Sequence, residues 1–330
     1  MKNKISFLFI LLSPIFSSEG QEIFEQQNDD FVRSLDQTYL KGLLFLQNSQ
    51  GVDGRWTDSS YGSEPGVLGM AILAFLSRGD DPEFGPFSKS LSQAVDQILR
   101  QQNKDTGYIG SSMYNHGFAT LALAEYYGVT NHSDIGPALK KATNLIVSAQ
   151  KTNPKGAWRY SPESKDADTT ITGAQLVALF ASKNAGMQVP DEAIAKAKKF
   201  LIECQDEKGG FGYTGNSGAN LPRTAIGSLI LALDKDTESK EFKASVEYLR
   251  ENARFGDQGH KFYSLYYTSQ AMFRASPKDW DKWNLANVRQ LQATQAENGS
   301  WNSNYGSTFA TSAALLSMAL NYRYLPIYER

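Results

Sequence analysis

The stretch Lys-Gly-Leu-Leu-Phe-Leu-Gln-Asn-Ser-Gln-Gly-Val-Asp-Gly-Arg-Trp, residues 41–56, decides the fold. It reads as the end of a helix with a glutamine, then a turn with glycines, then an aromatic residue. The same order returns with Trp158, Phe211 and Trp301, and a weaker copy ends in Gly107-Tyr108. A further copy lacks the glutamine. The glutamines of the clear copies are Gln50, Gln102, Gln150, Gln205 and Gln295. Their spacing predicts structural repeats with a period of about 50 residues.

Each repeat contains two helices of different kinds. The first is amphipathic: Ala142, Leu145, Ile146 and Ala149 form an apolar stripe at helical spacing, with lysines off the stripe. The second is apolar nearly all round, as in residues 67–76, and such a helix is enclosed by protein on most sides. An inner ring of apolar helices within an outer ring of amphipathic helices satisfies both patterns.

Six such hairpins that close on themselves leave no exposed end that would need a cap. We therefore predict an all-α fold, an α/α toroid of six helical hairpins with an inner and an outer ring of helices. A single domain of six repeats would span residues 21–330.

The repeat resembles a known family. A basic residue, a small residue, an aromatic residue or leucine, the glutamine and then Gly-x-Trp resemble the QW repeat of squalene-hopene cyclases and prenyltransferase-like α/α toroids. Residues 114–119, 266–273 and 279–284 are similar to bacterial members that consist of a single toroid. The resemblance implies that each glutamine binds the end of a neighbouring outer helix, whose terminal backbone groups need partners. The aromatic residue would pack beneath it. A carbohydrate-binding role for Trp56, Trp158 and Trp301 is the alternative.

Residues 1–20 read as a signal peptide. Two lysines precede an apolar run from Ile5 to Phe16, and small residues follow up to Gly20. This run is shorter than the about 20 helical residues that cross a bilayer. We expect cleavage near Gly20, no transmembrane segment, and a secreted or periplasmic protein. The formal net charge of −2 provides no basic surface for nucleic acid, which is therefore not an expected partner.

The sequence offers little that could bind a metal. Its one cysteine, Cys204, lies on the apolar stripe of an outer helix, where a core thiol is expected. His116, His132 and His260 are far apart and lack the short spacing of metal-binding pairs. The zinc protein prenyltransferases of this fold use an Asp, a Cys and a His, and the position of Cys204 does not suit that set. We expect neither a metal nor a cofactor.

Candidate binding residues follow each Gly-x-Trp turn. In the predicted ring, these loops and the first turns of the inner helices meet at one mouth, and ligand sites are typically concave with a few polar groups. We therefore predict a site at the mouth for a hydrophobic small molecule, a polymer or a partner protein. Its predicted binding residues are Tyr61, Glu64, Tyr114, His116, Thr169, Arg223, Tyr263, Tyr267 and Tyr305.

Two aspartates at the start of the third inner helix are the candidate catalytic residues. Asp166-Ala167-Asp168-Thr169 resembles the Asp-x-Asp-Asp signature of class II triterpene cyclases, in which the middle aspartate protonates an alkene or epoxide. The resemblance implies that Asp168 is a general acid, which needs a pKa raised toward the working pH. The fourth position is Thr169, where the signature has an aspartate. The alternative is that Asp168 caps the helix, since aspartate is a preferred N-cap and a helix N-terminus favours its ionised form.

Three functions stay open from the sequence. The first is a binding protein of unproven activity that takes its ligand or partner at the mouth. The second is an isoprenoid (triterpene) cyclase-like enzyme with Asp168 as the acid. The third is a polysaccharide lyase or hydrolase, because glycan enzymes also use α/α toroids and the mouth carries aromatic and carboxylate side chains.

Overall fold

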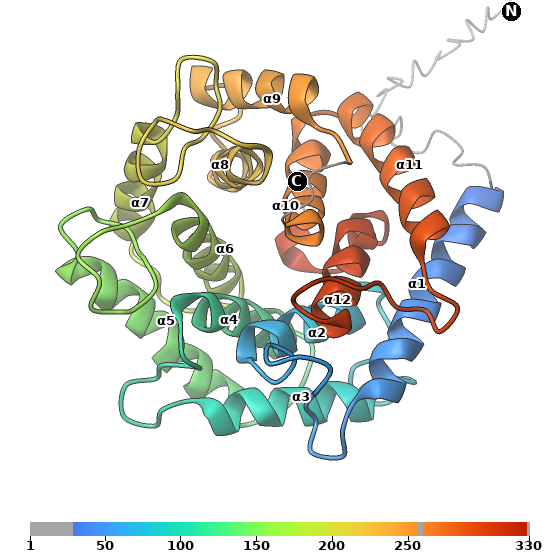
Figure 1. Ribbon diagram of the computed structural model, residues 1–330. Coiled ribbons are helices and arrows are strands. Elements are labelled where there is room, and N and C mark those ends of the chain that lie inside the picture. Colours follow the sequence, from blue (N-terminus) through green and yellow to red (C-terminus); the bar gives the residue numbers. More distant parts are fainter. Residues whose placement is uncertain (1–28, 256–259, 329–330) are drawn as a thin grey trace, which may run out of the picture.

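The structure is a computed structural model that describes residues 29–255 and 260–328. The predicted signal peptide lies outside these residues. The described chain forms twelve α-helices, which alternate between an outer and an inner ring (Figure 1). The outer helices are α1 (Asp29–Ser49), α3 (Ser88–Gln101), α5 (Ile135–Thr152), α7 (Asp191–Glu203), α9 (Lys240–Asn252) and α11 (Pro277–Thr294). The inner helices are α2 (Pro65–Ser77), α4 (Met113–Tyr127), α6 (Thr169–Asn184), α8 (Leu221–Leu233), α10 (Lys261–Ala275) and α12 (Ser307–Met318).

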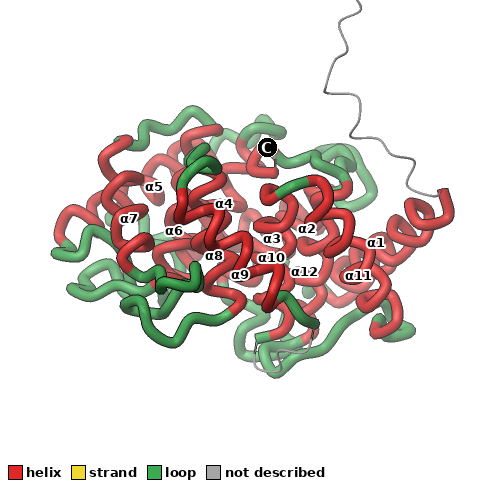
Figure 2. Tube along the Cα trace, turned by 90° about the horizontal axis from the view of Figure 1, so that it is seen from above, coloured by secondary structure: helices red, strands yellow, loops and turns green. Residues whose placement is uncertain are grey.

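The inner helices pack in order around the ring, and α12 returns to contact α2. Every residue of α2 is buried, as its apolar sequence predicts. The connecting loops gather along the two opposite edges of the molecule (Figure 2). The predicted all-α toroid of six hairpins is therefore confirmed.

Small residues let the inner helices approach one another closely. A Cβ atom on Gly69 of α2 would lie 2.6 Å from the carbonyl oxygen of Phe118 in α4. One on Gly173 of α6 would collide with Ile226 of α8. Neither position has room for a methyl group, because a Cβ atom needs more than 3 Å to a neighbouring atom.

The repeated glutamines join neighbouring outer helices. Gln150 Nε2 donates to the carbonyl of Gly156 in its own turn (2.8 Å) and to that of Ala193 in the first turn of α7 (2.7 Å). The indole of Trp158 donates back to Ile146 in α5 (2.8 Å). The same pair of amide bonds recurs at Gln50, Gln102, Gln205 and Gln295. The three motif tryptophans, Trp56, Trp158 and Trp301, are at most 2% exposed and cannot present a ring to a carbohydrate.

Gln295 closes the outer ring. Its Nε2 donates to Thr38 of α1 (3.0 Å), which lies 257 positions earlier in the chain. In the second repeat, Ile109 and not Tyr108 occupies the buried place of the motif aromatic residue: Ile109 forms the bridge with Gln102 and is fully buried. Ile109 is the second residue after Gly107, and the other repeats carry their aromatic residue at this same place. The place in the repeat, and not the type of side chain, therefore decides which residue is buried.

The C-terminal segment covers the end of the ring where the inner helices finish. Arg274, in the last turn of α10, donates to the carbonyl of Ile327 in the 3₁₀ helix η2 (Pro326–Tyr328), and η2 contacts α6. Tyr322 packs edge-on against Tyr39 of α1, with ring centroids 4.9 Å apart. The opposite end, where the inner helices begin, carries the cavity described below.

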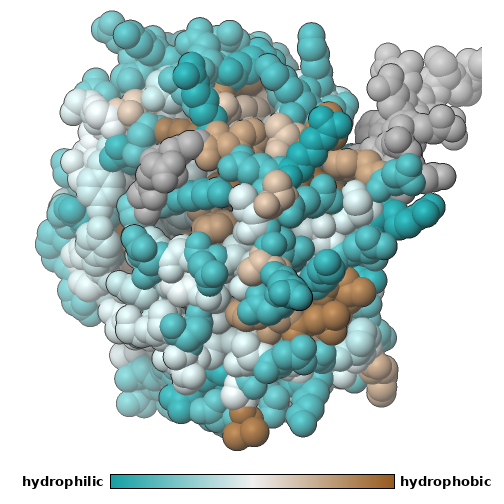
Figure 3. Space-filling model, turned by 45° about the vertical axis from the view of Figure 1, so that its right-hand side comes forward, coloured by the Kyte–Doolittle hydropathy of each residue, from teal (hydrophilic) through white to brown (hydrophobic). Residues whose placement is uncertain are grey.

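On the face drawn in Figure 3, brown side chains gather in one patch toward the lower right and in another toward the top, and hydrophilic side chains border both. Val52 and Phe84 are 97% and 86% exposed, but each stands on a separate loop. Between residues 29 and 255 and between 260 and 328, no helix combines the length and the hydropathy that a membrane span requires.

Candidate functional site

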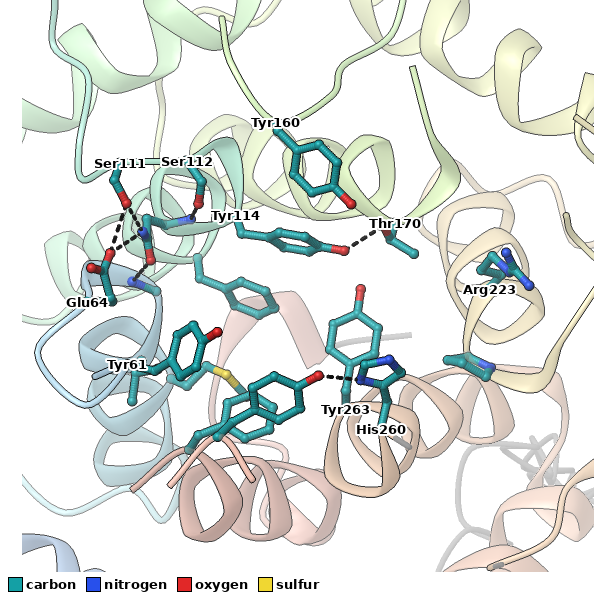
Figure 4. Close-up of a pocket in the computed structure, with 18 of the residues that line it drawn as sticks. Tyr61, Glu64, Ser111, Ser112, Tyr114, Tyr160, Thr170, Arg223, His260 and Tyr263 are labelled. Atoms are coloured by element: carbon teal, nitrogen blue, oxygen red, sulfur yellow. Dashed lines mark hydrogen bonds between the residues drawn. The ribbon is translucent and has the colours of Figure 1, made fainter. Parts of the chain in front are cut away.

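A cavity of about 610 Å³ opens at the rim where the six inner helices begin (Figure 4). Each inner helix contributes its second or third residue to the wall, so the helices all start on the same side of the ring. Eight lining side chains are phenylalanine or tyrosine: Tyr61, Tyr114, Phe118, Tyr160, Tyr213, Tyr263, Tyr305 and Phe309. The polar ones are Glu64, Ser111, Ser112, Asn115, Thr170, Asn220, Arg223 and His260. A concave, mostly apolar wall with a few polar groups is typical of small-molecule sites.

Six of the nine predicted binding residues line this cavity. They are Tyr61, Glu64, Tyr114, Arg223, Tyr263 and Tyr305. The other three, His116, Thr169 and Tyr267, are not among its lining residues. The structure also adds lining residues that the sequence analysis did not select, among them Tyr160, Tyr213 and His260.

Asp168 is the N-cap of α6. Its Oδ1 accepts the backbone N–H groups of Thr170 and Ile171, both at 2.9 Å, and the hydroxyl of Thr170 at 2.6 Å. The side chain is fully buried, and burial raises its pKa above the ordinary value, although the capping bonds oppose that shift. Its other oxygen, Oδ2, lies 3.7 Å from Arg159 Nε and has no hydrogen-bond partner in the part of the chain that the structure describes. Asp168 is therefore a capping residue just behind the wall, not a lining residue.

A chain of hydrogen bonds connects Asp168 to the cavity. The hydroxyl of Tyr114 donates to Thr170 Oγ1 (2.5 Å), and Thr170 in turn donates to Asp168 Oδ1. Both Tyr114 and Thr170 line the cavity. An ionised Asp168 therefore fixes the direction of both bonds, because a carboxylate can only accept.

Two tyrosines and two arginines form one side of the rim. The hydroxyls of Tyr160 and Tyr213 are 2.6 Å apart, and the guanidinium groups of Arg159 and Arg223 lie over the ring of Tyr213 at 5.5 and 5.7 Å. Arg159 also pairs with Asp166, whose side chain is exposed. Asp166, the second candidate catalytic residue, thus holds Arg159 outside the cavity.

His116 is part of the scaffold. Its Nδ1 accepts the backbone N–H of Ile109 (3.1 Å), and its Nε2 therefore donates to the carbonyl of Ala142 in α5 (3.1 Å). Burial lowers the pKa of His116 to about 4, so the ring is neutral. In other repeats a threonine of the inner helix, Thr172, Thr224 or Thr311, receives the N–H of the motif aromatic residue.

Thr169 and Tyr267 also support the wall from behind. The hydroxyl of Thr169 donates to the carbonyl of Gly212 (2.7 Å), which fixes the loop that carries Tyr213. Tyr267 is buried, and its ring packs edge-on against Tyr263 with centroids 4.9 Å apart. Among the described residues the hydroxyl of Tyr263 has no hydrogen-bond partner, and burial raises its pKa well above the ordinary value.

The opposite side of the cavity is built around Glu64, at the start of α2. Its Oε2 accepts the hydroxyl of Ser111 (3.2 Å) and the amide of Asn115. The oxygen of Asn115 accepts the backbone N–H of Gly66 (3.1 Å), and this bond turns the amide NH₂ toward Glu64. The carboxylate is thus held in a fixed place by neutral donors.

The described residues contain no cluster of three metal-ligating side chains. Cys204 is buried, and burial raises the pKa of its thiol, which disfavours the thiolate that binds metals.

These features define the class: an α/α toroid whose inner ring encloses an aromatic-lined cavity at one rim. Over residues 49–328 the chain matches the model of a family described as a domain of unknown function (DUF6288), and it belongs to that family.

Two kinds of solved structure share the fold. The type II terpene cyclase MstE from Scytonema, without ligand, is 15% identical, with a TM-score of 0.61 over 89% of this chain and 99% of that one. The GH76A α-1,6-mannanase from Salegentibacter sp. HEL1_6 is 11% identical, with a TM-score of 0.65 over 86% of this chain and 98% of that one. A family 76 glycoside hydrolase from a bovine Bacteroides thetaiotaomicron strain is 9% identical, with a TM-score of 0.66 over 88% and 78%. At such identities the likeness establishes the fold alone.

Proposed function

We propose that the chain is an exported, single-toroid protein of the squalene-cyclase-like type whose cavity binds an apolar small molecule of isoprenoid size. The observation that carries the proposal is the wall of eight phenylalanine and tyrosine rings around about 610 Å³. That volume lies within the range of about 300–1,000 Å³ in which proteins bind drug-sized ligands. The basic and apolar residues at positions 1–20 support export to the periplasm or the exterior.

Burial of apolar ligand surface supplies the binding energy in such a site. Each buried methylene group contributes about 0.8 kcal/mol, which corresponds to an increase in affinity of about fourfold. The affinity for a series of 1-alkanols should therefore rise with chain length and level off when the cavity is full.

Titration calorimetry with this series tests the proposal. Val67, at 7% exposure, lines the cavity, so Val67→Trp should occupy part of it and lower the affinity for the longer alkanols. The matched control is Val52→Trp, because Val52 is 97% exposed on the turn before Trp56. Both variants should keep the far-UV circular dichroism of the wild type. Equal affinity of the wild type and Val67→Trp for every alkanol would show that the cavity is not the site.

A second candidate is cyclase-like chemistry with Asp168 as the general acid. Burial raises the pKa of Asp168, and the chain through Thr170 leads to the hydroxyl of Tyr114 at the cavity wall. Proton delivery to an alkene would require both bonds to reverse, with Tyr114 as the last donor. Incubation with squalene and polyprenyl substrates should then yield cyclised products that are lost in Asp168→Asn, and the absence of product from the wild type would exclude this chemistry.

Glycan cleavage is supported less well. Most glycosidases place two carboxyl groups on either side of the scissile bond. Among the described lining residues, Glu64 supplies the one carboxylate. Release of reducing ends from a glycan panel remains the test of this alternative.

A further inference from the structure

We propose that the ligand of the cavity carries a positively charged ammonium group, which binds between the carboxylate of Glu64 and the neighbouring aromatic rings. This inference rests on the proposed function, because it assigns the polar group of the same apolar ligand.

The charge of Glu64 has no counterion among the described residues. Its bonds come from the hydroxyl of Ser111 and the amide of Asn115, which are neutral. Within residues 29–255 and 260–328, no lysine or arginine pairs with Glu64, and no hydrogen bond reaches its Oε1. Glu64 is partly exposed, and an apolar ligand that fills the cavity would bury its carboxylate. A buried charge is costly unless it is paired, and a cation on the ligand would supply the pair.

A group of aromatic rings lies beside Glu64. Tyr61 belongs to the same turn, since its carbonyl accepts the N–H of Glu64 (2.9 Å). Tyr61 packs edge-on against Tyr305, and Tyr305 against Phe309, with centroids 5.6 and 5.4 Å apart. Figure 4 shows the ring of Tyr61 directed into the cavity close to Glu64. A cation over the face of such a ring is attracted by the negative charge of the π system.

The hydroxyl of Tyr114 can accept a hydrogen bond from a ligand but cannot donate one. Its single hydroxyl proton is committed to Thr170 Oγ1 at 2.5 Å, because the proton of Thr170 is committed to Asp168. The oxygen of Tyr114 therefore offers only lone pairs to a ligand. Glu64 and Tyr114 thus both favour a hydrogen-bond donor or a cation on the ligand.

The guanidinium of Arg223 stands on the opposite side of the cavity (Figure 4). Its Nε and Nη2 already donate to Asn220 Oδ1 (3.0 Å) and to the carbonyl of Gly218 (2.6 Å), and its face covers Tyr213. The Nε and Nη2 donors of Arg223 are therefore already paired within the protein, whereas Glu64 has no charged partner among the described residues.

Titration calorimetry with three probes of equal chain length tests the charge assignment. Octyltrimethylammonium, 1-octanol and octanoate, below their micellar concentrations, present a cation, a neutral group and an anion. The cation should bind wild-type protein about tenfold more tightly than 1-octanol, because a charge-assisted contact and a cation–π contact are added. Octanoate should bind most weakly.

Glu64→Gln should abolish the preference for the cation, and Glu207→Gln, which removes an exposed carboxylate on the turn after α7, should keep it. If 1-octanol or octanoate binds as tightly as the cation, the charge assignment is wrong while the apolar cavity stands. A tight octanoate complex that is lost in Arg223→Gln would place an anion there and overturn the inference. If none of the three probes binds, the proposed function itself fails.

Discussion

The neutral His116 should make the stability of the fold depend on pH between about 6.5 and 4. The unfolded chain takes up a proton near the ordinary pKa of histidine, about 6.5, whereas burial holds the pKa of folded His116 at about 4. Between these values the unfolded state binds more protons, so the free energy of unfolding falls as the pH falls. The stabilisation is complete above pH 6.5 and is lost progressively toward pH 4.

The size of this effect follows from the shift. The two pKa values differ by 6.5 − 4 = 2.5 units. At about 1.4 kcal/mol per pKa unit, the full loss is about 3 kcal/mol, of which about 2 kcal/mol is lost between pH 7 and pH 5. The structural cause is specific: a proton on Nδ1 would point at the N–H of Ile109, which now donates to that atom.

Urea unfolding at about pH 7 and pH 5, followed by circular dichroism, measures this loss. His116→Gln has no titrating ring and should lose the pH-dependent part, even if it is less stable at both pH values. The control is His132→Gln, because His132 is partly exposed and lies 3.5 Å from the exposed Asp96. The reasoning is refuted if His116→Gln shows the same loss between pH 7 and pH 5 as the wild type.

Three further perturbations test the scaffold. Gln295→Ala removes both amide bonds at the ring closure and should lower the free energy of unfolding by about 2 kcal/mol, measured as the shift in urea midpoint at constant slope. Gly173→Ala forces a methyl group against Cγ2 of Ile226 and should cost about 1–3 kcal/mol; because Ile226→Ala removes that atom, the double variant should lose less stability than the sum of the two single variants. Burial raises the folded-state pKa of Asp168 above 3.8, so the folded state holds this proton to higher pH and its stability falls as the pH rises above that value. Asp168→Asn should remove this part of the pH profile, which chemical unfolding at several pH values would reveal.

The sequence predicted the toroid because its determinants are repeated and local. Each glutamine lies four to six residues before the glycine of its turn, and the hydrogen bonds of Gln150 and Gln205 join one repeat to the next. The contrast between amphipathic and apolar helices then specified which helices lie outside and which inside. None of this required knowledge of contacts between distant residues.

The site was predicted less completely, because helical phase decides which side chains face the cavity. Tyr114 is the second residue of α4 and lines it, while His116, the fourth residue, points to the outer ring. Tyr160 and Tyr213 were not predicted, because they lie in irregular loops without a helical pattern. Each nevertheless stands two residues after its motif aromatic residue, and a comparison of repeats in register would have found them.

The return of α12 onto α2 has a consequence for biosynthesis. Helix α2 is apolar on all sides, and one of its neighbours in the inner ring is α12. At translation rates of about 5–20 residues per second, the ribosome needs more than about 10 s to proceed from the first of these helices to the second. During that time the unpaired flank of α2 is open to aggregation, so the nascent chain should depend on a chaperone until its last repeat emerges.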